Sequence, residues 1–255
     1  MRVTIIGSGN VAEALARAVA RCSSAELAGI AARNILRGNA IAGEVGCDCY
    51  ALDKAPEADL YLIAVSDSAV ADAEQATHFS SGAVVAHTAG AVSIDALHTP
   101  DHGVLYPFQT FTVGREVDFE PIPILFDGNT PKAADTIRSL AEMLSRSVFR
   151  ADDQLRRRVH LSGAFACNFV NRLYGIGGEI LAEANLPFEL LKPLIAETAA
   201  KALSTDRPQK VQTGAAVRGD LSSQQRHLEL LADDARKTEI YKLISKEIWE
   251  TSKKI

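Results

Sequence analysis

The sequence contains no long hydrophobic run and no excess of basic charge. No stretch of about 18 uninterrupted apolar residues occurs, so we expect no membrane span. The chain enters a glycine turn after only a few apolar residues, too few for a signal peptide, and we therefore expect a cytoplasmic protein. The formal net charge of -5 argues against a nucleic-acid partner, because such proteins carry a basic face.

Cysteine is also scarce, and the four that occur do not form a metal-binding pattern. Cys47 and Cys49 lie too close together for a conventional zinc half-site, and no second pair follows. We therefore predict no metal site, and reduced thiols, since disulfides are rare in the cytoplasm. The chain does contain 47% hydrophobic residues, enough for a sizeable core in one large or two modest domains.

The two halves of the chain differ in their patterns. Up to about residue 150, short apolar runs alternate with helical stretches, which predicts a parallel sheet covered by helices on both faces. The candidate strands are 3–6, 27–31, 59–65, 83–86, 104–106 and 122–126. Thr130 and Pro131 have the residue types of a cap and a first helical position. The sequence therefore predicts an α/β domain over residues 1–150 and, where strand signals fade, an all-α domain over 151–255.

The helical half begins with an unusually apolar segment, 152–185, which is predicted to form one long helix or a kinked pair. It carries apolar and small residues on more than one face, and a helix of that kind is usually buried. Further helices are predicted at 187–203 and within 221–249. The weak point of the first helix is predicted at its glycines, Gly175, Gly177 and Gly178. Because so small a domain has little interior of its own, we expect a homodimer formed through it.

The most informative motif is Gly7-Ser8-Gly9-Asn10-Val11-Ala12, which matches G-x-G-x-x-G/A between an apolar strand and a helix. The first glycine permits the tight turn, the second lets the backbone approach a pyrophosphate, and the alanine keeps the helix close to the sheet. Free amides at the helix N-terminus then bind phosphate. The motif predicts a dinucleotide site made by Gly7, Ser8, Gly9, Asn10 and Val11.

The end of the second candidate strand favours NADP over NAD. NAD-binding proteins normally have Asp or Glu there to bind the ribose hydroxyls. This chain has Ala31-Ala32-Arg33-Asn34 instead. The Arg33 guanidinium suits a 2′-phosphate, and Asn34 can add a donor. The alternative is that Arg33 is an ordinary surface arginine.

Three later strand ends supply further candidates, because ligands bind at the carboxyl ends of parallel strands. Val65 and Ser66 follow one strand and His87 another, and we assign all three to the cofactor. Substrate contacts are predicted for the small and polar residues beyond these ends, which are Thr88, Ala89, Gly90 and Gln109. A plain loop at 87–90 is the alternative. Tyr106 places a phenol near the same edge.

Polar residues on the first predicted helix of the second half form a candidate catalytic set. Asn168 and Asn171 lie three residues apart and share a face with His160. His160 can act as a general acid near neutral pH. Arg218, in a glycine-flanked stretch, can bind a substrate carboxylate. The alternatives are polar pairing across a helix interface and, for Arg218 with Asp220, anchoring of a loop.

A cluster of three arginines, Arg156-Arg157-Arg158, precedes this polar set. It fits a solvated patch near a helix start, or capture of a phosphate.

The whole chain resembles the bacterial family that pairs a Rossmann-like domain with a helical domain of unknown function, and that is provisionally labelled NADP oxidoreductase. The stretches that carry the resemblance are Ile6–Ala12, Tyr106–Thr110, His160–Asn171 and Gln212–Asp220. More distantly, the chain is similar to pyrroline-5-carboxylate reductase, ketopantoate reductase and the 3-hydroxyacid dehydrogenases. The resemblance implies a helical dimerisation domain of the 6-phosphogluconate-dehydrogenase-like type.

One departure from the hydroxyacid dehydrogenases concerns chemistry. Those enzymes carry a lysine shortly before an asparagine on the first long helix. Here Asn171 matches the asparagine, the candidate positions for the lysine are Cys167 and Asn168, and the lysine is absent. The resemblance as a whole implies an NADP-dependent oxidoreductase that transfers a hydride between NADPH and a small polar carbonyl or imine. The alternative is a non-catalytic NADP-binding sensor or dimeric scaffold.

Overall fold

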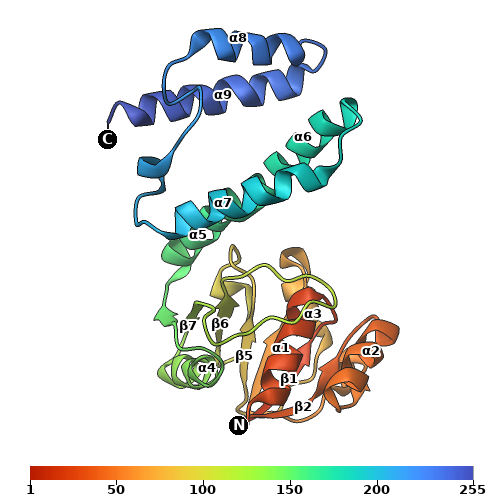
Figure 1. Cartoon of the computed structure of the whole chain (residues 1–255). Coiled ribbons are helices and arrows are strands. Elements are labelled where there is room, and N and C mark those ends of the chain that lie inside the picture. The colour runs from red at the N-terminus through yellow and green to blue at the C-terminus, as the bar shows by residue number, and fades with distance from the viewer. Residues whose placement is uncertain (255) are drawn as a thin grey trace. The chain divides into compact units, whose positions relative to one another are not determined.

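The computed structural model describes residues 1–254, and the chain divides into two compact units (Figure 1). The first unit is Met1–Ala164, and the second begins at Phe165. The sequence predicts a boundary at residue 150 instead. Helix α5 (Asp153–Gly163) belongs to the first unit, where Arg156 and His160 contact residues of the sheet domain.

The first unit is built on a sheet of eight strands in the order β3-β2-β1-β4-β5-β6-β7-β8. All neighbouring strands pair in parallel except β6 and β7, which are antiparallel. The strands are β1 (Arg2–Ile6), β2 (Glu26–Ala31), β3 (Cys49–Tyr50), β4 (Leu60–Ile63), β5 (Val84–His87), β6 (His102–Pro107), β7 (Ile124–Gly128) and β8 (Val148–Arg150). The predicted class, a Rossmann-type parallel sheet domain followed by a helical domain, is confirmed, and the antiparallel pair of β6 and β7 is an addition that the sequence pattern did not predict.

Helices cover both faces of this sheet, which explains why its strands are apolar runs. Alternate strand residues such as Ile5 and Leu62 face a core cluster with helices α1 (Asn10–Arg21), α2 (Ile35–Val45) and α4 (Pro131–Leu144). Residues of the opposite parity, such as Tyr61, pack with α3 (Val70–Ala76). Since both sides of each strand are buried, period-two alternation of polar and apolar residues is absent.

A buried carboxylate, Glu13, ties three parts of this unit together. Its Oε1 lies 2.7 Å from an Arg17 nitrogen on the same helix, and its Oε2 forms an ion pair with Arg37 of α2. The Gly114 amide donates to it at 3.1 Å. Two guanidinium groups and an amide thus compensate the cost of burying the charge at the start of α1.

The predicted helix 152–185 is helical from Asp153 to Glu183, but its irregularity lies elsewhere than expected. Helix α5 is followed by the π-helical segment η4 (Ala164–Phe169) and by α6 (Val170–Glu183). Gly175, Gly177 and Gly178 all lie inside α6, so the helix has no break at them. Gly178 is compatible with the helix because its missing side chain makes room for the Phe188 ring.

From Phe165 to residue 254, the regular secondary structure of the second unit is all helical, in agreement with the fading strand signals. Beyond α6 they are α7 (Lys192–Leu203), α8 (Leu221–Leu230) and α9 (Ala235–Ser252). His227 Nδ1 lies 2.8 Å from the Tyr241 hydroxyl between α8 and α9, and Lys237 donates to Glu183 of α6 at 2.9 Å. The shorter 3₁₀ helices of the chain are η1 (Leu52–Lys54), η2 (Asp67–Ala69), η3 (Ile94–Ala96), η5 (Phe188–Leu191) and η6 (Pro208–Val211).

Two further observations concern expected features. Within residues 1–254, no helix combines the length and the apolar character needed to cross a membrane. In the same residues, no cluster of three or more His, Cys, Asp or Glu side chains is arranged to hold a metal ion. All four cysteines are free thiols.

Candidate functional site

The glycine-rich turn joins β1 to α1 and leaves open space where the second glycine lies. Gly7 has a φ of +127°, and a Cβ there would collide with the Ala64 carbonyl, so only glycine fits. A Cβ at Gly9 would meet nothing within 4 Å. The backbone of Gly9 is therefore accessible to a ligand, and its position before Asn10 aims the first amides of α1 at that space.

A cavity of about 510 Å³ lies over this turn, at the carboxyl ends of β1, β2 and β4. It is lined by every cofactor residue proposed from the sequence except His87: Gly7, Ser8, Gly9, Asn10, Val11, Arg33, Asn34, Val65 and Ser66. Ala64, Gln109 and Phe111 complete its wall. Gln109, expected at the substrate, thus lies with the nucleotide residues.

The polar side chains of the cavity have defined roles in the local structure. Asn34 caps α2, since its Oδ1 accepts from the Arg37 amide at 3.1 Å. Asn10 Nδ2 donates to the Phe111 carbonyl at 2.9 Å, which holds the loop after β6 against the turn. Arg33 is exposed on the cavity wall. Its guanidinium is available to an anion in that space.

His87 is a correction to the sequence interpretation, because it cannot contact a cofactor directly. The side chain is 0% exposed, and both ring nitrogens are occupied. Nδ1 accepts from the Ala89 amide at 3.2 Å, so Nε2 carries the proton and donates to the Ser93 carbonyl at 3.2 Å. Burial, together with the nearby charge of Arg156, lowers the pKa of His87 to about 4. His87 is therefore a neutral residue that shapes the loop after β5.

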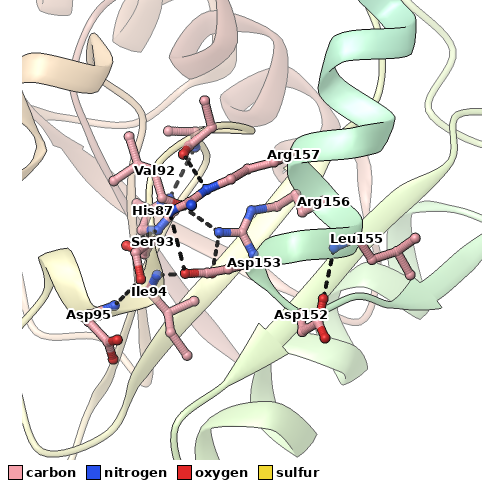
Figure 2. Close-up of polar contacts among 12 residues, drawn as sticks. His87, Val92, Ser93, Ile94, Asp95, Asp152, Asp153, Leu155, Arg156 and Arg157 are labelled. Carbon is pink, nitrogen blue, oxygen red and sulfur yellow. Dashed lines mark hydrogen bonds and ion pairs between the residues drawn. The ribbon is translucent and has the colours of Figure 1, made fainter.

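The same loop is held to α5 by a buried ion-pair network, shown in Figure 2. Arg156 is 0% exposed and donates to the Val92 carbonyl and, at 2.6 Å, to Asp153. Asp153 in turn accepts from the Ile94 amide at 3.3 Å. Burial alone would raise the pKa of Asp153, but hydrogen bonds from Ser93 and Arg156 outweigh it and hold that pKa below its usual value.

This network corrects the interpretation of the arginine cluster. Arg156 is neither a solvated residue nor open to a phosphate, since it is enclosed and paired. Arg157 is exposed, but its Nε donates to the Ala91 carbonyl at 3.2 Å. Together the two arginines fix the start of α5 to residues 91–94.

The residues after β5 that were assigned to the substrate differ in burial and in whether their polar groups already have hydrogen-bond partners. Thr88 and Ala89 are buried, and the Thr88 hydroxyl donates to the Ile63 carbonyl at 3.4 Å. Thr88 is therefore occupied by the sheet, which corrects its assignment as a substrate ligand. Gly90 lies directly against His160 and Tyr106. The Tyr106 hydroxyl is 3.0 Å from His160 Nδ1.

The remaining candidates lie in the second unit. Asn168 is in η4 and Asn171 in α6, and both are exposed. Arg218 is exposed in the segment before α8, where its charge helps to lower the pKa of Asp220 after hydrogen bonds from Ser223. His160 belongs to the first unit, so the proposed catalytic set draws on both units.

Tyr106 makes a contact that the sequence interpretation missed. The pattern placed its phenol at a strand end without giving it a partner. A tyrosine at the carboxyl end of a parallel strand is a signal of the right kind, but its contact with His160, 54 residues later, depends on how α5 packs.

The fold and the cavity define the class of protein: a Rossmann-like domain followed by a helical domain. Residues 1–106 match the family model of the Rossmann-like domain, and residues 122–248 match the domain of unknown function DUF2520. The chain belongs to the family that combines these two domains. A comparison with curated proteins found no match.

Solved structures similar to the chain agree with this membership. A provisional NADP oxidoreductase from Bacteroides fragilis is 33% identical with a TM-score of 0.88, and the match covers 98% of both chains. A protein from Thermotoga maritima is 20% identical with a TM-score of 0.76 over 98% of this chain and 99% of its own. A 1-pyrroline-5-carboxylate reductase from Streptococcus pyogenes shares the fold at 15% identity and a TM-score of 0.59, covering 100% and 99% of the two chains.

Proposed function

We propose that this protein is an NADP-dependent oxidoreductase that transfers a hydride between NADPH and a small polar carbonyl or imine substrate. The observation that carries the proposal is the cavity that unites the Gly7–Val11 turn with Arg33 and Asn34. The description of the Bacteroides fragilis relative as an NADP oxidoreductase supports it. When bound, the nicotinamide supplies the hydride, while the protein binds and orients the cofactor and the substrate and excludes water.

The residues of the cavity fit a dinucleotide with a 2′-phosphate. The open space at Gly9 admits the pyrophosphate to the backbone amides that begin α1. Arg33 follows β2, where NAD-binding proteins carry a carboxylate, and its exposed guanidinium would pair with the 2′-phosphate. Asn34 retains its Nδ2 donor, because only Oδ1 is used in capping α2.

Within the first unit, Gly90 and His160 remain the proposed substrate contacts, and Asn168, Asn171 and Arg218 remain separate candidates on the second unit. A small polar substrate fits amide and guanidinium donors of this kind. The second candidate function, an NADP-binding sensor or scaffold without turnover, is favoured by Cys167 in the place of a catalytic lysine.

The decisive test of the cofactor is a pair of binding titrations. Arg33→Ala should weaken NADPH binding about 10- to 100-fold and NADH binding little, because only NADPH offers the charged 2′-phosphate. Arg138→Ala, an exposed arginine on α4 away from the cavity, is the matched control and should change neither. An equal loss for both nucleotides would contradict the 2′-phosphate assignment.

Turnover separates the two candidate functions. An oxidoreductase should consume NADPH when offered a panel of 2-oxoacids, 3-oxoacids and cyclic imines. A sensor or scaffold should bind NADPH with saturation and leave every member of the panel unchanged.

We further propose that the protein is a cytoplasmic homodimer formed through the second unit. Among the described residues from Phe165 onward only Leu231 is buried, and large apolar side chains such as Phe165 and Leu194 are each 63% exposed. An apolar groove of about 380 Å³ lies between α6, α8 and α9. A second copy of the same unit would cover these surfaces, and four free thiols suit a reducing compartment.

A further inference from the structure

A phenol–imidazole pair in the first unit is packed against a glycine. The Tyr106 hydroxyl of β6 lies 3.0 Å from His160 Nδ1 of α5, and the two rings are 5.9 Å apart between centroids. A Cβ at Gly90, in the loop after β5, would lie 2.6 Å from His160 Nδ1 and 2.7 Å from Tyr106 Cζ. Three separate elements therefore meet at this point, and a side chain at residue 90 would force the pair apart.

Neighbouring contacts hold both members of the pair in place. The Phe108 ring lies 6.2 Å from that of Tyr106, and it fills the space left by the absent side chain of Gly163 on α5. At the other end of α5, Arg156 and Arg157 bind the loop that leads away from Gly90. The hydroxyl and the imidazole are thus oriented before any ligand binds.

The pair lies beside the nucleotide cavity. Strands β4, β5 and β6 are consecutive parallel neighbours, so their carboxyl ends share one edge of the sheet. With about 4.8 Å between strands, the end of β6 lies roughly 10 Å from the end of β4, where Ser66 lines the cavity. Gln109, three residues after Tyr106, lines the same cavity. A substrate next to the bound nicotinamide would therefore be within reach of the phenol.

We propose that Tyr106 is the proton donor of the reaction and that His160 is the residue that positions and reprotonates its hydroxyl, an assignment that rests on the proposed function. In reduction, the hydride brings an electron pair to the substrate carbon, and the C=O or C=N π bond opens toward oxygen or nitrogen. The Tyr106 O–H bond breaks and its proton passes to that atom. His160 Nδ1–H donates to the tyrosinate and gives it its proton, while Nε2 of this exposed residue takes up the one proton that the solvent supplies per turnover. The imidazole leaves this step as its Nε2–H tautomer and regains Nδ1–H by proton exchange with the solvent.

The surroundings of Tyr106 hold its proton more tightly than water does, so the step needs a group that stabilises the tyrosinate. Burial of the hydroxyl, and then the negative charge of Asp67, raise the pKa of Tyr106 above its usual value. The phenol is protonated at neutral pH, and the raised pKa makes it a weaker acid, so its proton transfer depends on a partner that stabilises the tyrosinate. The bond from His160 Nδ1–H stabilises the tyrosinate as it forms, which is the moment when such a bond lowers the barrier.

The direction of the hydrogen bond can be measured on the protein without cofactor. Tyrosinate absorbance at 295 nm is followed with pH, and Tyr106→Phe identifies the signal of Tyr106 among the five tyrosines. If His160 donates to the phenol, His160→Phe should raise the pKa of Tyr106, because the tyrosinate loses a donor. If the pKa of Tyr106 falls or does not move, His160 does not act as a donor and the relay is overturned.

Turnover with the best substrate of the panel tests the catalytic assignment. Tyr106→Phe should lower kcat about 100-fold or more and leave the Kd for NADPH unchanged, as expected for loss of a general acid. His160→Phe should lower kcat by about 10- to 100-fold, and His160→Asn, whose amide can donate in place of Nδ1, should recover part of the loss. Tyr106→Phe turnover within twofold of the original rules the proposal out.

The glycine provides a test that leaves both side chains in place. Gly90→Ala should separate the pair and lower kcat, whereas Gly43→Ala in α2, where a Cβ meets nothing within 4 Å, should not. Failure of the proposed function would be recognised separately: the unaltered protein would turn over no substrate at all, and the absorbance titration would still decide whether His160 donates to Tyr106.

Discussion

The two units of this chain differ most in how much of their apolar surface is buried. In the first, helices on both faces of the sheet enclose strand residues such as Ile5 and Leu62 completely. In the second, Leu231 is the only buried residue of the described part, although the helices are rich in leucine, isoleucine and phenylalanine. A unit of this size cannot be stable on such burial alone. The comparison indicates that the second unit has a composition suited to an interface.

Disruption of the proposed dimer is expected to give the largest effect, because it would leave the apolar surface of the second unit uncovered. Leu194→Glu should weaken self-association at least tenfold in sedimentation equilibrium, since burying each leucine is worth about 1.5–3 kcal/mol and a twofold interface counts it twice. Leu36→Glu is the control, because Leu36 is 86% exposed on α2 of the first unit. If the unaltered protein and the variant were both monomeric, a dimer interface could not explain the exposed apolar surface of the second unit.

The core of the first unit should respond strongly to a truncation that the surface tolerates. Leu62→Ala in β4 should lower the free energy of unfolding by about 2–5 kcal/mol, through lost burial and the cavity left behind. Leu36→Ala should change it by less than about 0.5 kcal/mol. Urea denaturation of the three proteins gives the comparison, and similar midpoints would contradict the assigned core.

His87 should give the first unit a pH dependence. Its pKa of about 4 lies below the usual 6.5, so between these two pH values His87 is protonated in the unfolded chain and neutral in the folded chain. Above pH 6.5 the titration of His87 does not lower the free energy of unfolding. As the pH falls below this value, the loss of free energy of unfolding grows and reaches about 3 kcal/mol near pH 4. Urea denaturation from pH 7 to pH 4 should show a shallower loss for His87→Gln. Parallel curves for the two proteins would show that His87 does not titrate in this way.

The smallest expected effect concerns the cap of α2 at the cavity wall. Asn34→Ala should lower the free energy of unfolding by about 1 kcal/mol, because the Arg37 amide loses its side-chain acceptor. Asn34→Ser should retain most of the stability. Thermal unfolding of the two variants measures the difference, and equal losses would show that the capping bond contributes little.

Much of the first unit could be predicted from local pattern. The glycine turn lies between β1 and α1, and Thr130 caps α4 by accepting from the Ala133 amide at 3.1 Å, which confirms that prediction. Both depend on residues close in sequence, whose conformational preferences do not need the rest of the fold. The sequence pattern did not predict that β6 and β7 pair antiparallel, because an apolar run does not reveal the direction in which its strand crosses the sheet.

The residues around His160 could not be assigned from pattern. Whether an arginine is solvated or buried depends on what lies above it, and Arg156 is enclosed by a loop some 60 residues earlier in the chain. His87 follows the same rule, since its partners at Ser93 and Ala89 exist only once that loop has folded back. A polar residue at a strand end thus indicates a site without showing which atoms remain free.

The sequence alone determined that a glycine turn opens a parallel sheet and that an arginine stands where a carboxylate is usual, because turns and strand ends are local features. It also determined that the second half is helical and too apolar for its size. Only the tertiary structure decided that Arg156 and His87 are enclosed and that Tyr106 meets His160 over Gly90. Those contacts join β6, β5 and α5, and the distance between such elements is set by packing of the whole unit rather than by any residue's own preference.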